Sequence, residues 1–204
     1  MMPEKLEPMD FIRALMEPLS VEKGTPTYTA DQGFQQWVIE NANVVVERYR
    51  QSQSNLHWTK NDLKNALIGF SGQLAFERLL QYLNTPYDTD EPIARIRKPF
   101  DFKLSIGTVE VKSYDHYCQY TIIKDGEWKG NDFLIVWQYA DNTHNRIILK
   151  GWLTKQEVES YPIIPKGECP QTPLASARVI PMKKLHEPKK FIEKMKTASV
   201  GQNS

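Results

Sequence analysis

Asp101, Glu110 and Lys112 are the residues of this chain whose types and spacing could do chemistry together. Two neighbouring carboxylates repel each other and need a counter-charge or a bound cation. Carboxylate oxygens, completed by water, suit Mg²⁺ or Mn²⁺. Such an ion can bind a phosphate and activate a water molecule, and a nearby lysine can position or deprotonate that water and screen developing charge. The three side chains would therefore suit hydrolysis of a phosphodiester bond.

The three residues lie on two alternating stretches that predict a β-hairpin. Residues 100–104 (FDFKL) and 109–112 (VEVK) alternate apolar and charged side chains, as half-buried strands do. With residues 106–107 as a two-residue turn, Asp101 would pair with Lys112. The charged side chains of both strands would then share one face of the hairpin. The alternative is an exposed face whose cross-strand ion pairs contribute about 0.2–1 kcal/mol each.

A predicted helix over residues 60–83 supplies a further acid. At about 100° per residue, Glu77 falls about 20° from Phe70, in the middle of the apolar stripe that must face the sheet. A carboxylate in that position is costly unless it is paired or binds a metal. We therefore expect Glu77 to meet the charged face of the hairpin, with a structural salt bridge as the alternative. Gln73 lies on the edge of the same stripe, one turn earlier.

The remaining pattern predicts an α/β fold in three parts. Residues 1–58 form a helical N-terminal segment, residues 59–160 the core, and residues 161–204 a proline-rich loop and a basic helix packed on that core. The sequence predicts strands at 131–139, 146–152 and 177–180, a short helix ending at Ser160 that Thr154 and Glu157 cap, and a final helix at 187–196. The apolar run 133–137 indicates a strand buried on both faces.

Composition excludes several classes of protein and indicates the cellular compartment. The net charge of +1 argues against a histone-like polycation. Cys118 and Cys169, the two cysteines, make neither a disulfide framework nor a CxxC zinc pair. Prolines and acids interrupt the first twenty residues, so no secretory signal is expected. No apolar run approaches the roughly 18 residues of a membrane span. We expect a cytoplasmic protein with no membrane partner.

Several other side chains are open to a functional or a structural interpretation. His116 and Cys118 could share a strand face, but a zinc site would need two further ligands. Tyr114, Tyr117 and Tyr120 could stack on bases, although aromatic residues more often line a core or its rim. The lysines of the last helix could touch phosphates or simply be solvated. Residues that contact nucleic acid are not identified by the sequence.

The chain resembles the PD-(D/E)xK nuclease superfamily in the order of three features. These are a helix with an acid, then Pro99 shortly before Asp101, then Glu110-Val111-Lys112 on the next strand. That group includes restriction endonucleases, Holliday-junction resolvases and phage or repair exonucleases. The resemblance covers roughly residues 63–152. It implies a restriction-endonuclease-like core in αβββαβ order, with a mixed sheet of four to five strands flanked by helices, and one or two divalent metals.

The resemblance also implies roles for individual residues. Asp101 and Glu110 would hold Mg²⁺ or Mn²⁺, and Lys112 would be the catalytic lysine. The helix acid in the metal shell would be Glu77, but many relatives write this helix as G-x-x-G-E, and here that stretch is Gly69-Phe70-Ser71-Gly72-Gln73. Whether Gln73 or Glu77 meets the hairpin is therefore open. Gln138 is expected to support the site, because relatives often carry a polar residue on that strand.

Together the residues and the resemblance predict a magnesium-dependent nuclease, a DNA endonuclease of the restriction, repair or phage type. DNA is the expected partner, and a homodimer would supply two active sites for cutting both strands. The alternative is a catalytically inactive module of the same fold that binds nucleic acid or another protein. The sequence leaves open endonuclease against exonuclease, DNA against RNA, and the recognition sequence.

Overall fold

The computed structural model describes residues 20–22, 25–29, 33, 35–40, 42, 60–89 and 100–200. The named helices are α3 (Lys60–Tyr82), α4 (Lys155–Ser160), α5 (Pro188–Val200) and the 3-10 helix η1 (Met182–Lys184). The strands are β1 (Ser20–Glu22), β2 (Thr25–Thr29), β3 (Tyr87–Thr89), β4 (Phe102–Leu104), β5 (Gly107–Tyr114), β6 (Tyr120–Lys124), β7 (Phe133–Tyr139), β8 (Arg146–Thr154) and β9 (Ala177–Pro181). The chain is therefore a mixed α/β protein, as predicted.

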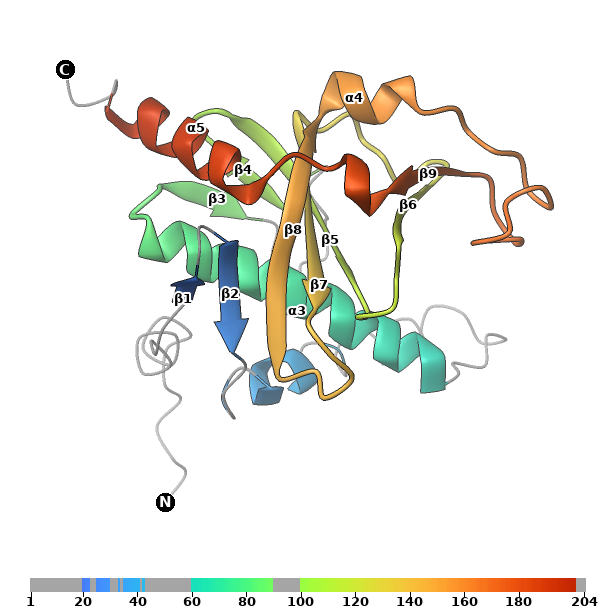
Figure 1. Ribbon diagram of the computed structural model, residues 1–204, viewed down its shortest axis with the longest axis horizontal. Helices are drawn as coiled ribbons and strands as arrows, with labels where there is room; N and C mark the ends of the chain where they lie inside the picture. The colour runs from blue at the N-terminus through green and yellow to red at the C-terminus, as the bar shows by residue number, and fades with distance from the viewer. Residues whose placement is uncertain are drawn as a thin grey trace.

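Seven strands form one sheet in the order β1-β2-β8-β7-β5-β4-β3, and β6 and β9 form a separate antiparallel pair (Figure 1). Within the large sheet β5 and β7 are parallel, and every other neighbouring pair is antiparallel. The sheet has more strands than the four to five expected. The additional strands come from the N-terminal segment and from the stretch after α3, where the sequence lacks a long alternating pattern.

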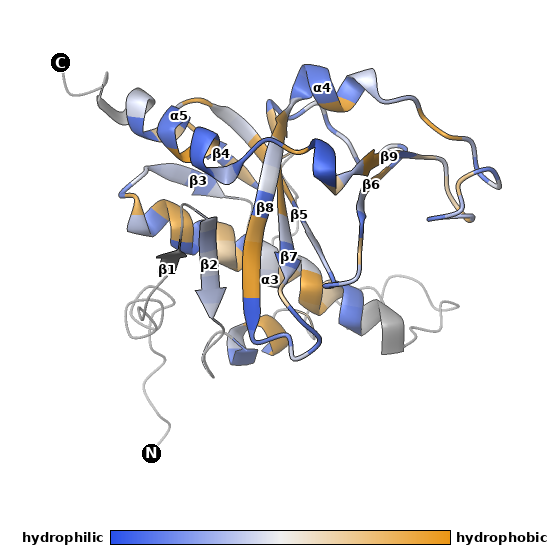
Figure 2. Cartoon of the chain, viewed as in Figure 1, coloured by the Kyte–Doolittle hydropathy of each residue, from blue (hydrophilic) through white to orange (hydrophobic). Residues whose placement is uncertain are grey.

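Two apolar clusters lie on opposite faces of the large sheet. The larger one joins α3 to the sheet and includes Phe76, Phe102, Val109 and Phe191. The smaller one, under β6, β9 and α4, consists of Ile123, Leu134, Val136, Leu153, Val158 and Ile180. All seven residues of β7 are buried, which confirms the predicted strand covered on both faces. Figure 2 shows α3 with apolar and hydrophilic residues interspersed, and residues 70–72, 74–76 and 78–80 of the helix are buried.

Helix α3 approaches β5 closely at one point. A Cβ atom added to Gly72 would lie 2.6 Å from the Ser113 Cβ, whereas one added to Gly69 would meet nothing within 4 Å. The Ser113 hydroxyl donates a 2.7 Å hydrogen bond to the Ile68 carbonyl. Glycine at position 72 therefore brings the helix backbone against the strand beside the predicted site, whereas Gly69 has no such role.

The N-terminal segment and the crossover differ from their predictions. We predicted a helical segment over 1–58, but residues 20–22 and 25–29 are strands, and β2 pairs with β8. Residues 35–40 are helical as expected. Residues 1–19 of the predicted helical segment and Pro99 lie outside the described residues. The αβββαβ order places a helix between β5 and β7, but residues 115–132 contain β6 instead.

The C-terminal predictions are confirmed by local structure. Thr154 caps α4, and its side chain accepts a hydrogen bond from the Glu157 amide, while the Glu157 side chain accepts one from the Thr154 backbone. Strand β9 and α5 occupy the predicted positions, and Phe191 of α5 contacts Phe76 of α3 with ring centroids 6.3 Å apart. Among the described helices, none has the length and apolar character needed to cross a bilayer.

Candidate active site

The β4–β5 hairpin places the charged residues on the predicted face, but in a different register. Phe102 pairs with Val109 and Leu104 with Gly107, so the turn is formed by residues 105–106 and not by 106–107. The predicted pairing of Asp101 with Lys112 is thus wrong by two residues. Because side chains alternate with a period of two, a slip of two residues leaves every side chain on its expected face.

Asp101 lies just before β4 and is held by both neighbouring elements. Its side chain is 8% exposed. Oδ2 accepts a 2.7 Å hydrogen bond from the Val111 amide of β5, and Oδ1 accepts a 2.9 Å bond from Nε2 of Gln73 on α3. The carboxylate is therefore fixed in orientation where α3 and the β4–β5 hairpin meet.

Glu110 and Lys112 form an ion pair on β5. The Lys112 Nζ lies 3.0 Å from Glu110 Oε1 and 3.5 Å from Glu127 Oε2. Asn131 donates a 3.4 Å hydrogen bond to the other oxygen of Glu110. Burial disfavours the charged amine, but Glu110 and Glu127 outweigh burial and raise the pKa of Lys112 above its usual value. Lys112 is therefore an ammonium ion at neutral pH.

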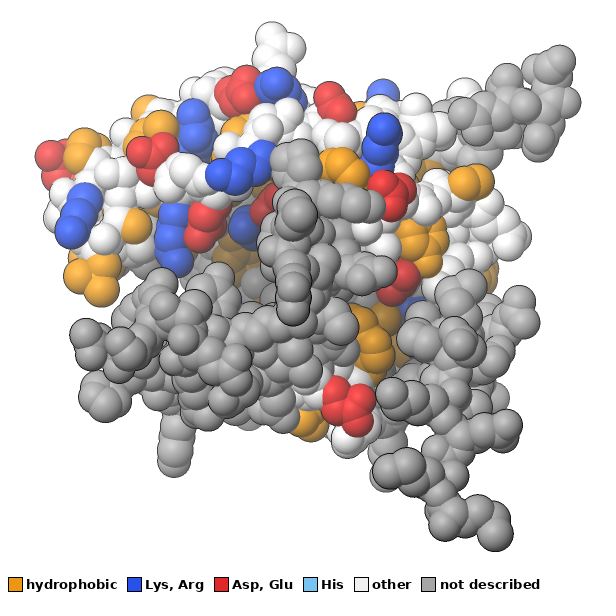
Figure 3. All heavy atoms as spheres, turned by 180° about the vertical axis from the view of Figure 1, so that it is seen from behind, with side chains coloured by type: hydrophobic (Ala, Val, Ile, Leu, Met, Phe, Trp, Pro, Cys, Tyr) orange, Lys and Arg blue, Asp and Glu red, His pale blue; other side chains and the backbone are white. Residues whose placement is uncertain are grey.

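A cleft of about 780 Å³ brings these side chains together. Gln73 of α3 lines it together with Asp101, Glu110 and Lys112 of the hairpin. Its other lining residues include the cations Lys64 and Lys124 and the anions Asp115 and Glu127. The cleft thus mixes both signs of charge. On the face shown in Figure 3, acidic and basic side chains of the described residues are likewise interspersed.

The helix residue that meets the hairpin is Gln73, not Glu77. Glu77 is half-buried and accepts a 2.8 Å hydrogen bond from the Tyr87 hydroxyl of β3. Burial raises the pKa of Glu77. The two residues share a direction around the helix axis, but Glu77 lies one turn, about 6 Å, further along it. That displacement puts Glu77 under β3 and outside the residues that line the cleft.

Gln138 does not reach the cleft but holds the loop at its end. It is buried, and its Nε2 lies 3.0 Å from the Asp115 carbonyl, 3.1 Å from that of His116 and 2.7 Å from that of Cys118. Gln138 is therefore not among the residues that line the cleft, contrary to the expectation that it points into the site. It fixes the backbone from which Asp115 and Cys118 line the cleft.

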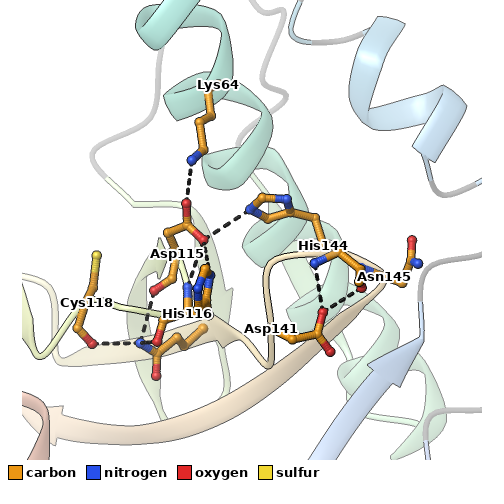
Figure 4. A network of polar contacts seen from close by, with 9 residues as sticks. Lys64, Asp115, His116, Cys118, Asp141, His144 and Asn145 are labelled. Atoms are coloured by element: carbon orange, nitrogen blue, oxygen red, sulfur yellow. Dashed lines mark hydrogen bonds and ion pairs between the residues drawn. The ribbon is translucent and has the colours of Figure 1, made fainter.

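Asp115 organises a polar network at the end of β5 that the sequence did not single out. Lys64 of α3 lies 2.5 Å from one carboxylate oxygen, and His116 and His144 lie 2.8 Å and 3.1 Å from the other (Figure 4). Burial raises the pKa of this carboxyl, but the hydrogen bonds from Lys64 and the histidines outweigh burial and hold it well below its usual range. The polar run that follows the E-x-K strand was the available signal for this cluster.

The donor set of the cleft fits a hard divalent cation with an incomplete protein shell. Among the described residues, no group of three or more His, Cys, Asp or Glu side chains converges as a metal site. Asp101 and Glu110 provide two carboxylates, and Mg²⁺ characteristically takes one or two carboxylates and keeps several waters. The same set does not suit zinc, which prefers nitrogen and sulfur ligands in a closed shell.

No family model, curated protein or solved structure matches this chain.

Proposed function

We propose that this protein is a metal-dependent nuclease of the PD-(D/E)xK type that hydrolyses phosphodiester bonds in DNA. The observation that carries the proposal is that Asp101, Glu110 and Lys112 line one cleft together with Gln73. An antiparallel β3-β4-β5 meander after α3, followed by a strand parallel to β5, supports a restriction-endonuclease-like core. The crossover through β6 is a departure from that fold.

Asp101 and Glu110 would hold the cation. When bound, Mg²⁺ or Mn²⁺ would polarise the phosphate and lower the pKa of a water molecule. Gln73 and the Val111 amide orient Asp101 before any cation binds, so little reorganisation of that carboxylate is needed.

Lys112 has an electrostatic role in this proposal. The ion pairs with Glu110 and Glu127 favour the charged ammonium form of Lys112. It can donate a hydrogen bond to the attacking water or to a phosphate oxygen, and its charge stabilises the negative charge that develops on that oxygen. Glu110 holds the ammonium in place through the 3.0 Å ion pair.

A catalytically inactive module that binds nucleic acid is the second candidate. The observation that favours it is the amide of Gln73 at the position where many PD-(D/E)xK relatives carry an acid. With Gln73 there, α3 places an amide and no carboxylate in the cleft beside Asp101 and Glu110.

Cleavage of supercoiled plasmid and of linear duplex DNA tests the proposal. We expect strand cleavage with Mg²⁺ or Mn²⁺ and none with EDTA, and its loss in Asp101→Asn. Asp125→Asn is the matched control, because Asp125 is exposed and does not line the cleft. Metal-dependent cleavage that survives Asp101→Asn would overturn the assignment. Binding of DNA by the wild type without any cleavage would favour the inactive module.

A further inference from the structure

Tyr117 is a large aromatic residue that lies exposed at the end of the candidate active-site cleft. Its side chain is 66% exposed and lines the cleft that also holds Asp101 and Lys112. Exposing an aromatic ring to water forgoes the stabilisation that burial would provide. Most surface apolar residues need no explanation, but this one belongs to the wall of the proposed reaction site.

The ring stands on a loop that is held rigidly. Gln138 contacts the carbonyls on both sides of Tyr117, those of His116 and Cys118, as well as that of Asp115. The Cys118 amide donates a 3.1 Å hydrogen bond back to the Asp115 carbonyl. The imidazole of His116 packs edge-on against the Tyr117 ring, with centroids 5.3 Å apart and planes at 84°. The loop backbone and the His116 imidazole thus hold the ring, so stacking a ligand on it would order few additional groups.

A cation accompanies the ring. The Lys64 Nζ lies 5.8 Å from the Tyr117 centroid and 2.5 Å from Asp115, which anchors it. Lys64 also lines the cleft, and its side chain is nearly half exposed. An ammonium donates three hydrogen bonds, so Lys64 can contact a phosphate while Asp115 retains one of them. An aromatic face next to a backbone-binding cation is the combination by which proteins bind single-stranded nucleic acid.

We propose that Tyr117 and Lys64 form a subsite for an unpaired nucleotide, with the base stacked on the Tyr117 ring and its phosphate on the Lys64 ammonium. This rests on the proposed nuclease function and specifies its substrate: nucleic acid with an unpaired nucleotide next to the cleaved bond, as in a flap, an overhang or a single strand. A base inside a duplex is already stacked on both faces, so it cannot cover the ring without being extruded, which costs a few kcal/mol.

Equilibrium binding to labelled oligonucleotides in EDTA tests the subsite without cleavage. The full chain is titrated with an oligo(dT) single strand and with a blunt duplex of the same length. We expect Tyr117→Ala to weaken single-strand binding by roughly ten-fold, the loss of one base–aromatic stack, and to leave duplex binding unchanged. Tyr117→Phe retains the ring and should bind the single strand like the wild type.

Tyr120→Ala is the matched control. Tyr120 is also an exposed tyrosine of the same segment, but it lines a different hollow, with Lys150 and Met182. Equal binding by Tyr117→Ala and the wild type would overturn the subsite, as would a loss of the same size for the duplex, or a wild type that binds no single strand.

Cleavage assays separate this inference from the proposed function. With Mg²⁺, we expect faster cleavage of a flap or single-strand substrate than of a blunt duplex, and a Tyr117→Ala variant that loses this preference. Preferential cleavage of blunt duplex, with Tyr117→Ala unaffected, would reject the subsite and leave the nuclease assignment standing. Single-strand binding that depends on Tyr117 without any cleavage would reject the nuclease assignment and leave the subsite standing.

Discussion

Gln73 donates a 2.9 Å hydrogen bond to Asp101, which joins the middle of α3 to the start of β4. In this protein the helix therefore contributes an amide, and not a carboxylate, to the candidate active site. The amide orients Asp101 without adding charge.

Gln73→Glu should make the protein more dependent on a divalent cation. The substitution places a second carboxylate within hydrogen-bond distance of Asp101, where two like charges repel unless a cation lies between them. We expect a lower melting temperature than the wild type in EDTA and a larger rise on adding Mn²⁺. Differential scanning calorimetry measures both effects. An equal Mn²⁺-dependent rise in the variant and the wild type would contradict the placement of the cation at Asp101.

Lys112→Ala should remove cleavage without removing the cation. Lys112 is expected to stabilise the transition state electrostatically, and the loss of one such group typically lowers the rate by about 10²- to 10³-fold. The rise in melting temperature with Mn²⁺ should persist, because Asp101 and Glu110 remain. Lys103→Ala is the control, since Lys103 is exposed on the neighbouring strand β4. Cleavage by Lys112→Ala at the wild-type rate would show that Lys112 has no catalytic role.

Gly72→Ala and Gly69→Ala should have opposite effects on stability. An alanine Cβ at position 72 would collide with Ser113, and overpacking of this kind typically costs about 1–3 kcal/mol. At position 69 the space is open, so alanine should stabilise the helix by up to about 1 kcal/mol through its higher helix propensity. Urea unfolding followed by circular dichroism measures both changes. Equal stability of the two variants would show that α3 does not approach β5 this closely.

Glu77→Gln should stabilise the folded protein relative to the wild type by an amount that grows as pH rises. Burial raises the pKa of Glu77 in the folded protein above its ordinary value of 4.5. As pH rises through 4.5, Glu77 therefore ionises in the unfolded chain before it ionises in the folded protein. This difference stabilises the unfolded chain, so the free energy of unfolding of the wild type falls. Glutamine does not titrate and can still accept the hydrogen bond from Tyr87. We therefore expect the variant to match the wild type near pH 4 and to exceed its free energy of unfolding at pH 8.

The same Glu77→Gln variant distinguishes the two helix positions. Because Glu77 bonds to Tyr87 and does not line the cleft, its removal should leave the Mn²⁺-dependent rise in melting temperature unchanged. If Glu77→Gln loses that rise, Glu77 is a ligand of the cation, and the placement of Gln73 as the helix residue at the site is wrong.

Local patterns in the sequence determined the features that depend on neighbouring residues alone. Alternation in residues 100–104 and 109–112 fixed which side chains share a face of the hairpin, and the two-residue error in register did not alter that result. The capping box at Thr154 was predictable for the same reason, because all its hydrogen bonds lie within one turn of helix. The two-sided burial of β7 followed from its unbroken apolar run.

Tertiary structure decided the features that depend on distant partners. Helical periodicity gave the angular position of Glu77 correctly, but only the packing of α3 on β5 at Gly72 determined which turn of the helix reaches Asp101. Pairing of β2 with β8 and of β6 with β9 joins segments whose short sequences do not specify each other. The Asp115 network likewise needs α3 and the β7–β8 turn to meet, because an ion pair between distant residues leaves no periodic signal in the chain.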